Sequence, residues 1–151
     1  GANEEGITFI EFASNSGFDA QIASLKKRLK DEMLEGENEH IERLKMQLQE
    51  YFQGKRTSFD VNLVFTGTPF QKEVWKELMN IPFGETRSYK EQATAIGKPA
   101  AVRAVANANG DNLISIVIPC HRVIGSNGSL TGYGGGLENK KWLLDLEKKG
   151  H

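Results

Sequence analysis

The sequence predicts a small α/β unit over residues 1–66, followed by a mainly α-helical domain over residues 67–151 that contains a helix-turn-helix. Two observations support this division. Apolar residues of the first unit follow helical spacing between two short runs that favour β-strands, whereas the second unit has clear start and stop signals for several helices. The chain has 151 residues, 38% of them hydrophobic, and a net charge of −1, which is the composition of one or two soluble globular domains.

The first unit alternates strands and helices. Its apolar patterns predict strands over residues 7–12 and 59–65 and helices over residues 18–30 and 38–53. The acidic segment 31–38 is expected to be a loop. No residue pattern in this unit points to catalysis.

The helices of the second unit begin at recognisable residues. Thr68-Pro69-Phe70-Gln71 is a capping box with proline at the first helical position, and the helix behind it is expected to end at Ile81-Pro82-Phe83-Gly84. Ser88-Tyr89-Lys90-Glu91 is a second capping box, and it starts a short helix that stops at Gly97. A further helix over residues 99–108 follows a Gly-Lys-Pro turn, so the pair is expected to form a helix-turn-helix.

The helix over residues 99–108 has two interpretations. It carries mostly small side chains and one long one, Arg103. Such a helix could approach a narrow DNA groove closely and read the groove by its shape, with Arg103 as the probe. It could equally be an alanine-rich core helix whose arginine forms a surface ion pair. The sequence pI of about 6.4 does not favour either, because DNA binding at this charge needs a local positive field or helix N-termini.

The only cysteine of the chain, Cys120, follows an apolar run over residues 113–118 that predicts a strand, and Pro119 stiffens the exit from it. A lone cysteine after an apolar run is commonly a small buried hydrophobic residue. A reactive one needs positive or proton-accepting neighbours, because the thiolate is the nucleophile, and here His121 and Arg122 follow directly. A single cysteine excludes an internal disulfide and a multi-cysteine zinc site, and reliance on a free thiol indicates a reducing compartment, so we expect a cytoplasmic protein.

Three further residues are candidates for a site. Tyr133 lies in a glycine-rich segment, residues 125–136, which is either a flexible linker or a loop that folds over a bound group. Glu147 lies on the last predicted helix, residues 137–149, where it is either a solvated charge or a carboxylate that orients a histidine. Asn112 precedes the apolar run and could be a turn former. No segment has the length and apolarity of a membrane helix or the pattern of a signal peptide.

These motifs together resemble one family, the O6-alkylguanine-DNA alkyltransferases, also called methylated-DNA–protein-cysteine methyltransferases. The resemblance runs from about Gly67 to Glu147. It rests on these segments: Gly67-Thr68-Pro69-Phe70-Gln71, Ile81-Pro82-Phe83-Gly84-Glu85-Thr86, Ser88-Tyr89, Arg103-Ala104-Val105, Ile118-Pro119-Cys120-His121-Arg122-Val123-Ile124 and Gly132-Tyr133-Gly134-Gly135-Gly136-Leu137.

The resemblance implies a fold and a function. The first unit would be ribonuclease-H-like, and the second would be winged-helix-like. The protein would repair double-stranded DNA from the minor groove by flipping out an O6-alkylguanine and transferring its alkyl group irreversibly to Cys120, once per molecule. O4-alkylthymine stays open as a further substrate. The resemblance also implies a monomer without cofactor or metal, in the cytoplasm and associated with the nucleoid in a bacterium.

The resemblance assigns roles to individual residues. Cys120 would accept the alkyl group, His121 would take its proton through a water, and Glu147 would orient the histidine. Asn112 would brace the helix-turn-helix against the turn that carries Cys120. The remaining residues would bind substrate or DNA: Tyr89 as a hydrogen-bond donor to the flipped base, Val123 through its main chain, Tyr133 and Gly134 around the alkyl group, Arg103 in the base stack, and Ala101 and Ser126 at contact positions.

Some positions depart from the family pattern. Leu113 follows Asn112 where relatives usually have proline, which predicts a less rigid turn. Residues 109–111 are more acidic than expected near phosphates, and Ala100 stands where relatives often carry a basic residue, which predicts modest DNA affinity. Three other readings remain: a lesion-binding relative that does not react, which Cys120 argues against; a plain helix-turn-helix regulator; and a cysteine hydrolase, for which no signature is present. The chain could also be the repair module of a longer regulator.

Overall fold

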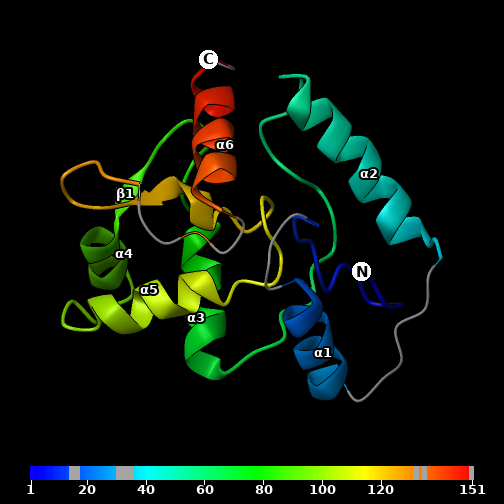
Figure 1. Cartoon of the computed structure of the whole chain (residues 1–151), viewed down its shortest axis with the longest axis horizontal. Coiled ribbons are helices and arrows are strands. Elements are labelled where there is room, and N and C mark those ends of the chain that lie inside the picture. Colours follow the sequence, from blue (N-terminus) through cyan, green and yellow to red (C-terminus); the bar gives the residue numbers. More distant parts are fainter. Residues whose placement is uncertain (14–17, 30–35, 131–132, 134–135, 150–151) are drawn as a thin grey trace.

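The fold is mostly helical and has two units (Figure 1). The computed structural model describes residues 1–13, 18–29, 36–130, 133 and 136–149. Helices α1 and α2 lie on one side of the molecule and α4 and α5 on the other, with α3 and α6 between them. The described elements are α1 (Phe18–Leu29), α2 (Glu39–Phe52), α3 (Pro69–Leu78), β1 (Arg87–Ser88), α4 (Tyr89–Ala95), α5 (Val102–Gly110), the 3-10 helix η1 (Cys120–Arg122), β2 (Val123–Ile124) and α6 (Leu137–Lys149).

The predicted capping boxes are both present. The Thr68 side chain accepts a hydrogen bond from the Gln71 backbone N–H at 3.1 Å, and the Gln71 side chain accepts one from Thr68 at 2.9 Å. Ser88 and Glu91 form the same reciprocal pair at the start of α4. Gly67, just before the first box, lies so close to Gln71 and Trp75 that a Cβ there would meet their side chains at 2.6 and 2.7 Å. This close approach explains the glycine of that motif.

The helix predicted over residues 99–108 begins and ends later than expected. It is α5, Val102–Gly110, and residues 98–101 instead form a turn in which the Ala101 N–H bonds to the Lys98 carbonyl at 2.9 Å. The helix therefore includes Asn109 and Gly110, which lie beyond its predicted end. The preceding helix α4 ends as predicted, with Gly97 at a φ of +75° and its N–H bonded to Thr94.

The predicted strands 7–12 and 59–65 are wrong as regular strands. Segment 7–12 lies between two other segments and pairs with each at a single point: Ile7 bridges Leu63, and Ile10 bridges Ile114, both in parallel orientation. Because the partner changes after three residues, no continuous ladder forms. The described strands of the chain are β1 and β2, which the sequence did not predict and which pair in parallel, Arg87 with Val123 and Ser88 with Ile124.

The predicted strand 113–118 is also wrong, because the backbone of this segment bonds to itself. The Val117 N–H bonds to Ser115, the Ile118 N–H to Ile114 and the Cys120 N–H to Ile118, all through carbonyl oxygens at 2.8–3.1 Å. Ile116 has a φ of +73°, which is rare for a β-branched residue and costs about 1–3 kcal/mol. The segment is thus a compact buried loop that ends at Cys120.

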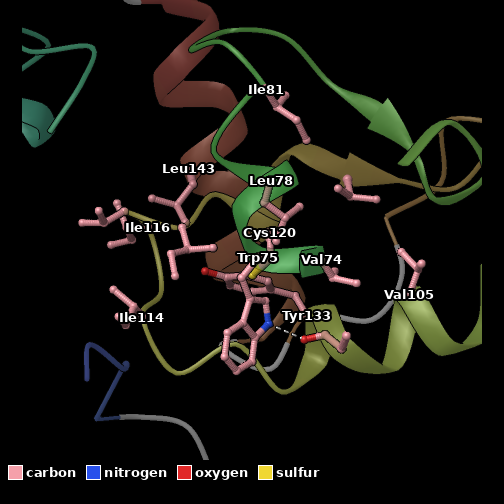
Figure 2. Close-up of a cluster of buried hydrophobic side chains, with 14 of the residues drawn as sticks. Val74, Trp75, Leu78, Ile81, Val105, Ile114, Ile116, Cys120, Tyr133 and Leu143 are labelled. Atoms are coloured by element: carbon pink, nitrogen blue, oxygen red, sulfur yellow. Dashed lines mark hydrogen bonds between the residues drawn. The ribbon is translucent and has the colours of Figure 1, made fainter. Parts of the chain in front are cut away.

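One hydrophobic core joins the two units. Ile7, Leu44 and Tyr51 of the first unit belong to the same cluster of buried side chains as Trp75 and Leu143 of the second. Figure 2 shows the part of this cluster around Cys120, whose sulfur lies among Trp75, Leu78 and Tyr133. The indole N–H of Trp75 donates to the Ala108 carbonyl at 2.8 Å, so α3 is fixed to α5 beside the thiol.

Candidate active site

Cys120 is the first residue of η1, and its thiol is buried, with 7% of the residue exposed. Burial raises the pKa of the thiol to about 11, although the hydrogen bond from Asn112 and the charge of Lys140 act in the opposite direction. The sequence pointed to the adjacent His121 and Arg122 as the groups that lower this pKa, but the groups that do so are Asn112 and Lys140. At neutral pH the thiol is therefore protonated, and a reaction at sulfur needs a base.

His121 is placed to be that base. Its ring is fully buried, and Nε2 lies 2.7 Å from Oε2 of Glu147. Burial lowers the pKa of His121, and the bond to Glu147 opposes this only in part, so the ring is neutral. A neutral ring facing a carboxylate carries its proton on Nε2, which leaves the lone pair on Nδ1. Nδ1 is buried and has no hydrogen-bond partner among the described residues, so it is available to accept a proton.

Glu147 lies at the centre of a group of donors. It is 1% exposed, so the sequence alternative of a solvated charge is wrong. Arg122 donates from Nε to Oε1 at 2.8 Å and from Nη2 to Oε2 at 3.1 Å, and its Nη1 bonds to the Ile81 carbonyl. Burial alone would raise the pKa of Glu147, but the bonds from His121 and Arg122 outweigh burial and hold the pKa at about 2. The carboxylate is thus ionised and fixed.

Asn112 connects the Cys120 turn to the end of α5. Its Nδ2 lies 2.9 Å from the Ile118 carbonyl, 3.3 Å from the Ile114 carbonyl and 3.3 Å from the Cys120 sulfur, while Oδ1 accepts from the Ile114 N–H at 3.0 Å. These bonds fold the apolar run into its loop, because one side chain satisfies backbone groups at both of its ends. Asn112 is more than a turn former: it positions the sulfur.

The sequence missed Lys140 as a member of the site. This residue is fully buried on α6, and its Nζ donates to the Val123 carbonyl at 2.6 Å and lies 5.9 Å from the centre of the Tyr89 ring. A signal was available: Lys140 precedes Glu147 by seven residues, or two helical turns, so both share the face of α6 that is buried. The first unit contributes a further missed residue, Tyr51, whose hydroxyl also reaches Glu147.

The other predicted residues divide into two groups. Val123 and Tyr133 are buried and Tyr89 is half-buried, and all three belong to or pack against the core that contains Cys120. Burial raises the pKa of the Tyr133 hydroxyl well above its usual value, so this group stays protonated. Arg103 and Ser126 are exposed, and Ala101, the N-cap residue of α5, is half-buried. Gly134 lies outside the described residues.

Helices α4 and α5 form a rigid pair. Gln92 and Asn109 are buried and exchange two hydrogen bonds between their side-chain amides, at 2.9 and 2.7 Å. The face of α5 opposite Val105 and Ala108 is exposed and carries Arg103, Ala104 and Asn107. One face of this helix is therefore core, and the other presents small side chains and one arginine to solvent.

Two other features are absent from the described residues. No group of three or more His, Cys, Asp or Glu side chains lies close enough together to hold a metal ion in the parts of the chain that the structure covers. None of the helices within those parts has the length and apolarity needed to span a bilayer.

Comparison with known proteins identifies the family. Residues 2–65 match the profile of the ribonuclease-like domain of 6-O-methylguanine DNA methyltransferase, and residues 69–149 match that of its DNA binding domain. The chain is 50% identical to the methylated-DNA–protein-cysteine methyltransferase of Methanosarcina barkeri over 147 residues, covering 97% of this chain and 87% of that protein. The chain therefore belongs to the 6-O-methylguanine DNA methyltransferase family.

Mycobacterial proteins are also similar. The methylated-DNA–protein-cysteine methyltransferase of Mycobacterium tuberculosis is 61% identical over 102 residues, which is 68% of this chain and 62% of that protein, so the match spans less than two thirds of this relative. The crystal structure of Mycobacterium tuberculosis OGT in complex with DNA superposes with a TM-score of 0.85 and 43% identity, covering 99% of this chain and 85% of that one. The two-unit fold is thus the fold of this family.

Proposed function

We propose that this protein repairs DNA by transferring the alkyl group of O6-alkylguanine to its own Cys120. The observation that carries the proposal is the state of His121: Nε2 is fixed by Glu147 at 2.7 Å, and Nδ1 is buried without a partner among the described residues. A neutral imidazole held in this way is the base that a buried thiol with a raised pKa requires.

The transfer is a displacement reaction at the alkyl carbon. The thiol proton passes through a water to Nδ1 of His121, and the sulfur forms a bond to the alkyl carbon. The bond between that carbon and O6 breaks, and its electron pair remains on guanine, where a hydrogen bond from the Tyr89 hydroxyl stabilises the developing charge. The product is a thioether, which no group of the site can cleave, so each molecule reacts once. Tyr133 lines the space for the alkyl group, and the main chain of Val123 faces the guanine amine; the role expected of Gly134 falls outside the described residues.

The surface of α5 supports DNA binding. An alkyl carbon inside a duplex is out of reach of a buried thiol, so the nucleotide has to be flipped out, at a cost of a few kcal/mol. We place α5 in the minor groove, where its small exposed residues permit close approach and Arg103 fills the gap in the base stack. Ala101 and Ser126 lie at the edge of this contact. The relative from Mycobacterium tuberculosis has been crystallised in complex with DNA, which supports DNA binding by this protein.

Several finer expectations belong to the same proposal. The boundary between the units falls between residues 66 and 67, the first unit is ribonuclease-H-like, and the second is winged-helix-like. The protein acts as a monomer in the cytoplasm, with the nucleoid as its location in a bacterium. It uses no cofactor, and alkylated guanine in double-stranded DNA is its substrate.

The proposal is tested by the intact mass of the protein after incubation with a duplex that contains one O6-methylguanine. The mass of the wild type is expected to rise by the exchange of one hydrogen atom for one methyl group, once per molecule. The mass of Cys120→Ala is expected to stay unchanged. Tight binding to the duplex without a mass change in the wild type would identify a lesion-binding protein and overturn the proposal.

A further inference from the structure

A tyrosine of the first unit reaches the carboxylate at the centre of the site. The hydroxyl of Tyr51, near the end of α2, lies 2.5 Å from Oε2 of Glu147, the same oxygen that faces Nε2 of His121 at 2.7 Å. Tyr51 and Glu147 are each 1% exposed. The bond joins residues 96 positions apart and links the two units inside the site.

The ring of Tyr51 is held by aromatic neighbours. Its centroid lies 5.4 Å from that of Phe59, 5.5 Å from that of Phe52 and 6.1 Å from that of Phe83. The residue after Phe83, Gly84, directs its N–H toward the other oxygen of Glu147 at 3.5 Å. Packing on several sides fixes the orientation of the ring. The hydroxyl is therefore held at the position from which it bonds to Glu147.

We propose that Tyr51 is a positioning residue for alkyl transfer: its hydroxyl shares Oε2 of Glu147 with His121 and so limits how strongly the carboxylate holds the histidine proton. The inference rests on the proposed function and extends it to the first unit. On this view the helix α2 is part of the proton-accepting arrangement as well as support for the fold. Tyr51 itself touches neither the thiol nor the substrate.

The charges around His121 give the bond a measurable effect. The charged groups that act on this ring are Glu147 and Lys140 from α6 and Arg122 from η1, and Tyr51 from α2 acts on it through Glu147. Tyr51 and His121 share Oε2 of Glu147. The hydrogen bond from the tyrosine hydroxyl therefore reduces the negative charge that the carboxylate presents to the histidine. Loss of the hydroxyl therefore raises the pKa of His121. Burial and the charge of Glu147 raise the pKa of Tyr51 far above its usual value, so it acts as a donor throughout the working pH range.

The experiment compares the pH dependence of methyl transfer in the wild type and Tyr51→Phe, which keeps the ring and removes the hydroxyl. Transfer from an O6-methylguanine duplex is followed under single-turnover conditions, over a range of protein concentrations at each pH. The acid limb of the maximal rate reports protonation of His121. We expect Tyr51→Phe to move this limb to higher pH by about one unit, while the protein concentration for half-maximal rate is unchanged.

A matched control separates the hydroxyl from the packing. Phe59→Leu disturbs the same aromatic group but leaves the hydroxyl and the site in place, so we expect it to lower the melting temperature and keep the wild-type acid limb. An unchanged limb in Tyr51→Phe would overturn the inference, and so would an equal shift in Phe59→Leu, because packing alone would then explain it.

The inference can fail independently of the proposed function. Titration of His121 by ¹⁵N NMR of histidine-labelled protein measures its pKa without any reaction. A higher His121 pKa in Tyr51→Phe supports the inference even if the wild type transfers no methyl group. An equal His121 pKa in the two proteins overturns it even if the wild type is fully active.

Discussion

The Nζ atom of Lys140 lies 2.6 Å from the carbonyl oxygen of Val123, which ties α6 to the strand that follows the Cys120 turn. The ammonium group is fully buried and lies over the Tyr89 ring. Helix α6 thus brings two opposite charges into the site from one face, Lys140 near β2 and Glu147 beside His121. The charge of Lys140 lowers the pKa of the Cys120 thiol, and the carboxylate of Glu147 bonds to the imidazole of His121.

Replacing Lys140 tests its effect on the thiol. Lys140→Met keeps most of the buried stem and removes the charge that lowers the pKa of Cys120, so this pKa is expected to rise above about 11. Alkylation of Cys120 by iodoacetamide at a fixed pH should then slow. The control is Lys141→Met on the next residue, whose side chain is exposed and pairs with Asp145, and which should react like the wild type. Equal rates in the two variants would contradict the role of the buried charge.

The stability of the protein should fall with acid in two stages. Burial lowers the pKa of His121 below 6.5, so the unfolded state binds this proton first and stability falls as the pH drops below about 6.5. The pKa of Glu147 is lowered from 4.5 to about 2, so its contribution is complete above pH 4.5 and is lost as the pH falls toward 2.

Thermal melts across this pH range separate the stages. His121→Gln replaces a titrating group by one that does not titrate, so the melting temperature of this variant should stay level between pH 6.5 and 4.5 and fall only below that range. A decline that starts at pH 6.5 in both proteins would show that another group is responsible.

Removing Asn112 should damage the loop before Cys120. Asn112→Ala leaves the Ile114 N–H buried without its acceptor and removes one of the two donors to the Ile118 carbonyl, and an unsatisfied buried group costs about 1–3 kcal/mol. We therefore expect the free energy of unfolding, measured in urea, to drop by about 3 kcal/mol. Asn107→Ala on the exposed face of α5 is the control and should change it by less than about 0.5 kcal/mol. A loss of the same small size in both variants would contradict the bracing role.

Arg103→Ala distinguishes nucleotide flipping from chemistry. Arg103 is exposed and is proposed to fill the base stack, so its loss should slow methyl transfer from a duplex by about tenfold or more. Transfer from free O6-alkylguanine base should keep its rate, because a free base needs no extrusion. An equal loss with both substrates would place Arg103 in the chemical step and contradict its role in the stack.

Local signals in the sequence predicted most helices and part of the site. Capping boxes and apolar spacing placed α1, α2, α4 and α6 to within two residues, because these features act over one or two turns; they also placed the start of α3, which ends at Leu78, three residues before Ile81. Residues 113–118 read as a strand for the same reason: the run is apolar and β-branched. Its actual shape depends on Asn112 and on the bridge to Ile10, which is more than a hundred positions away.

The site itself was predictable where a motif marks it. His121 follows Cys120 directly, and the resemblance to a family supplied Glu147 and Asn112. Tyr51 carried no such mark, since nothing near it in the sequence distinguishes it from a core aromatic residue. Its hydroxyl is recognised only when α2 is packed against α6, where the bond to Glu147 forms.

The core shared by the two units also bears on how the molecule unfolds. Ile7, Leu44 and Tyr51 lose their packing partners when the second unit opens, and Trp75 and Leu143 lose theirs when the first does. The units are therefore expected to melt in one cooperative transition. A substitution in α2 that never approaches the thiol would then shorten the lifetime of the folded loop that carries Cys120, since the loop and the helix belong to one cooperative unit.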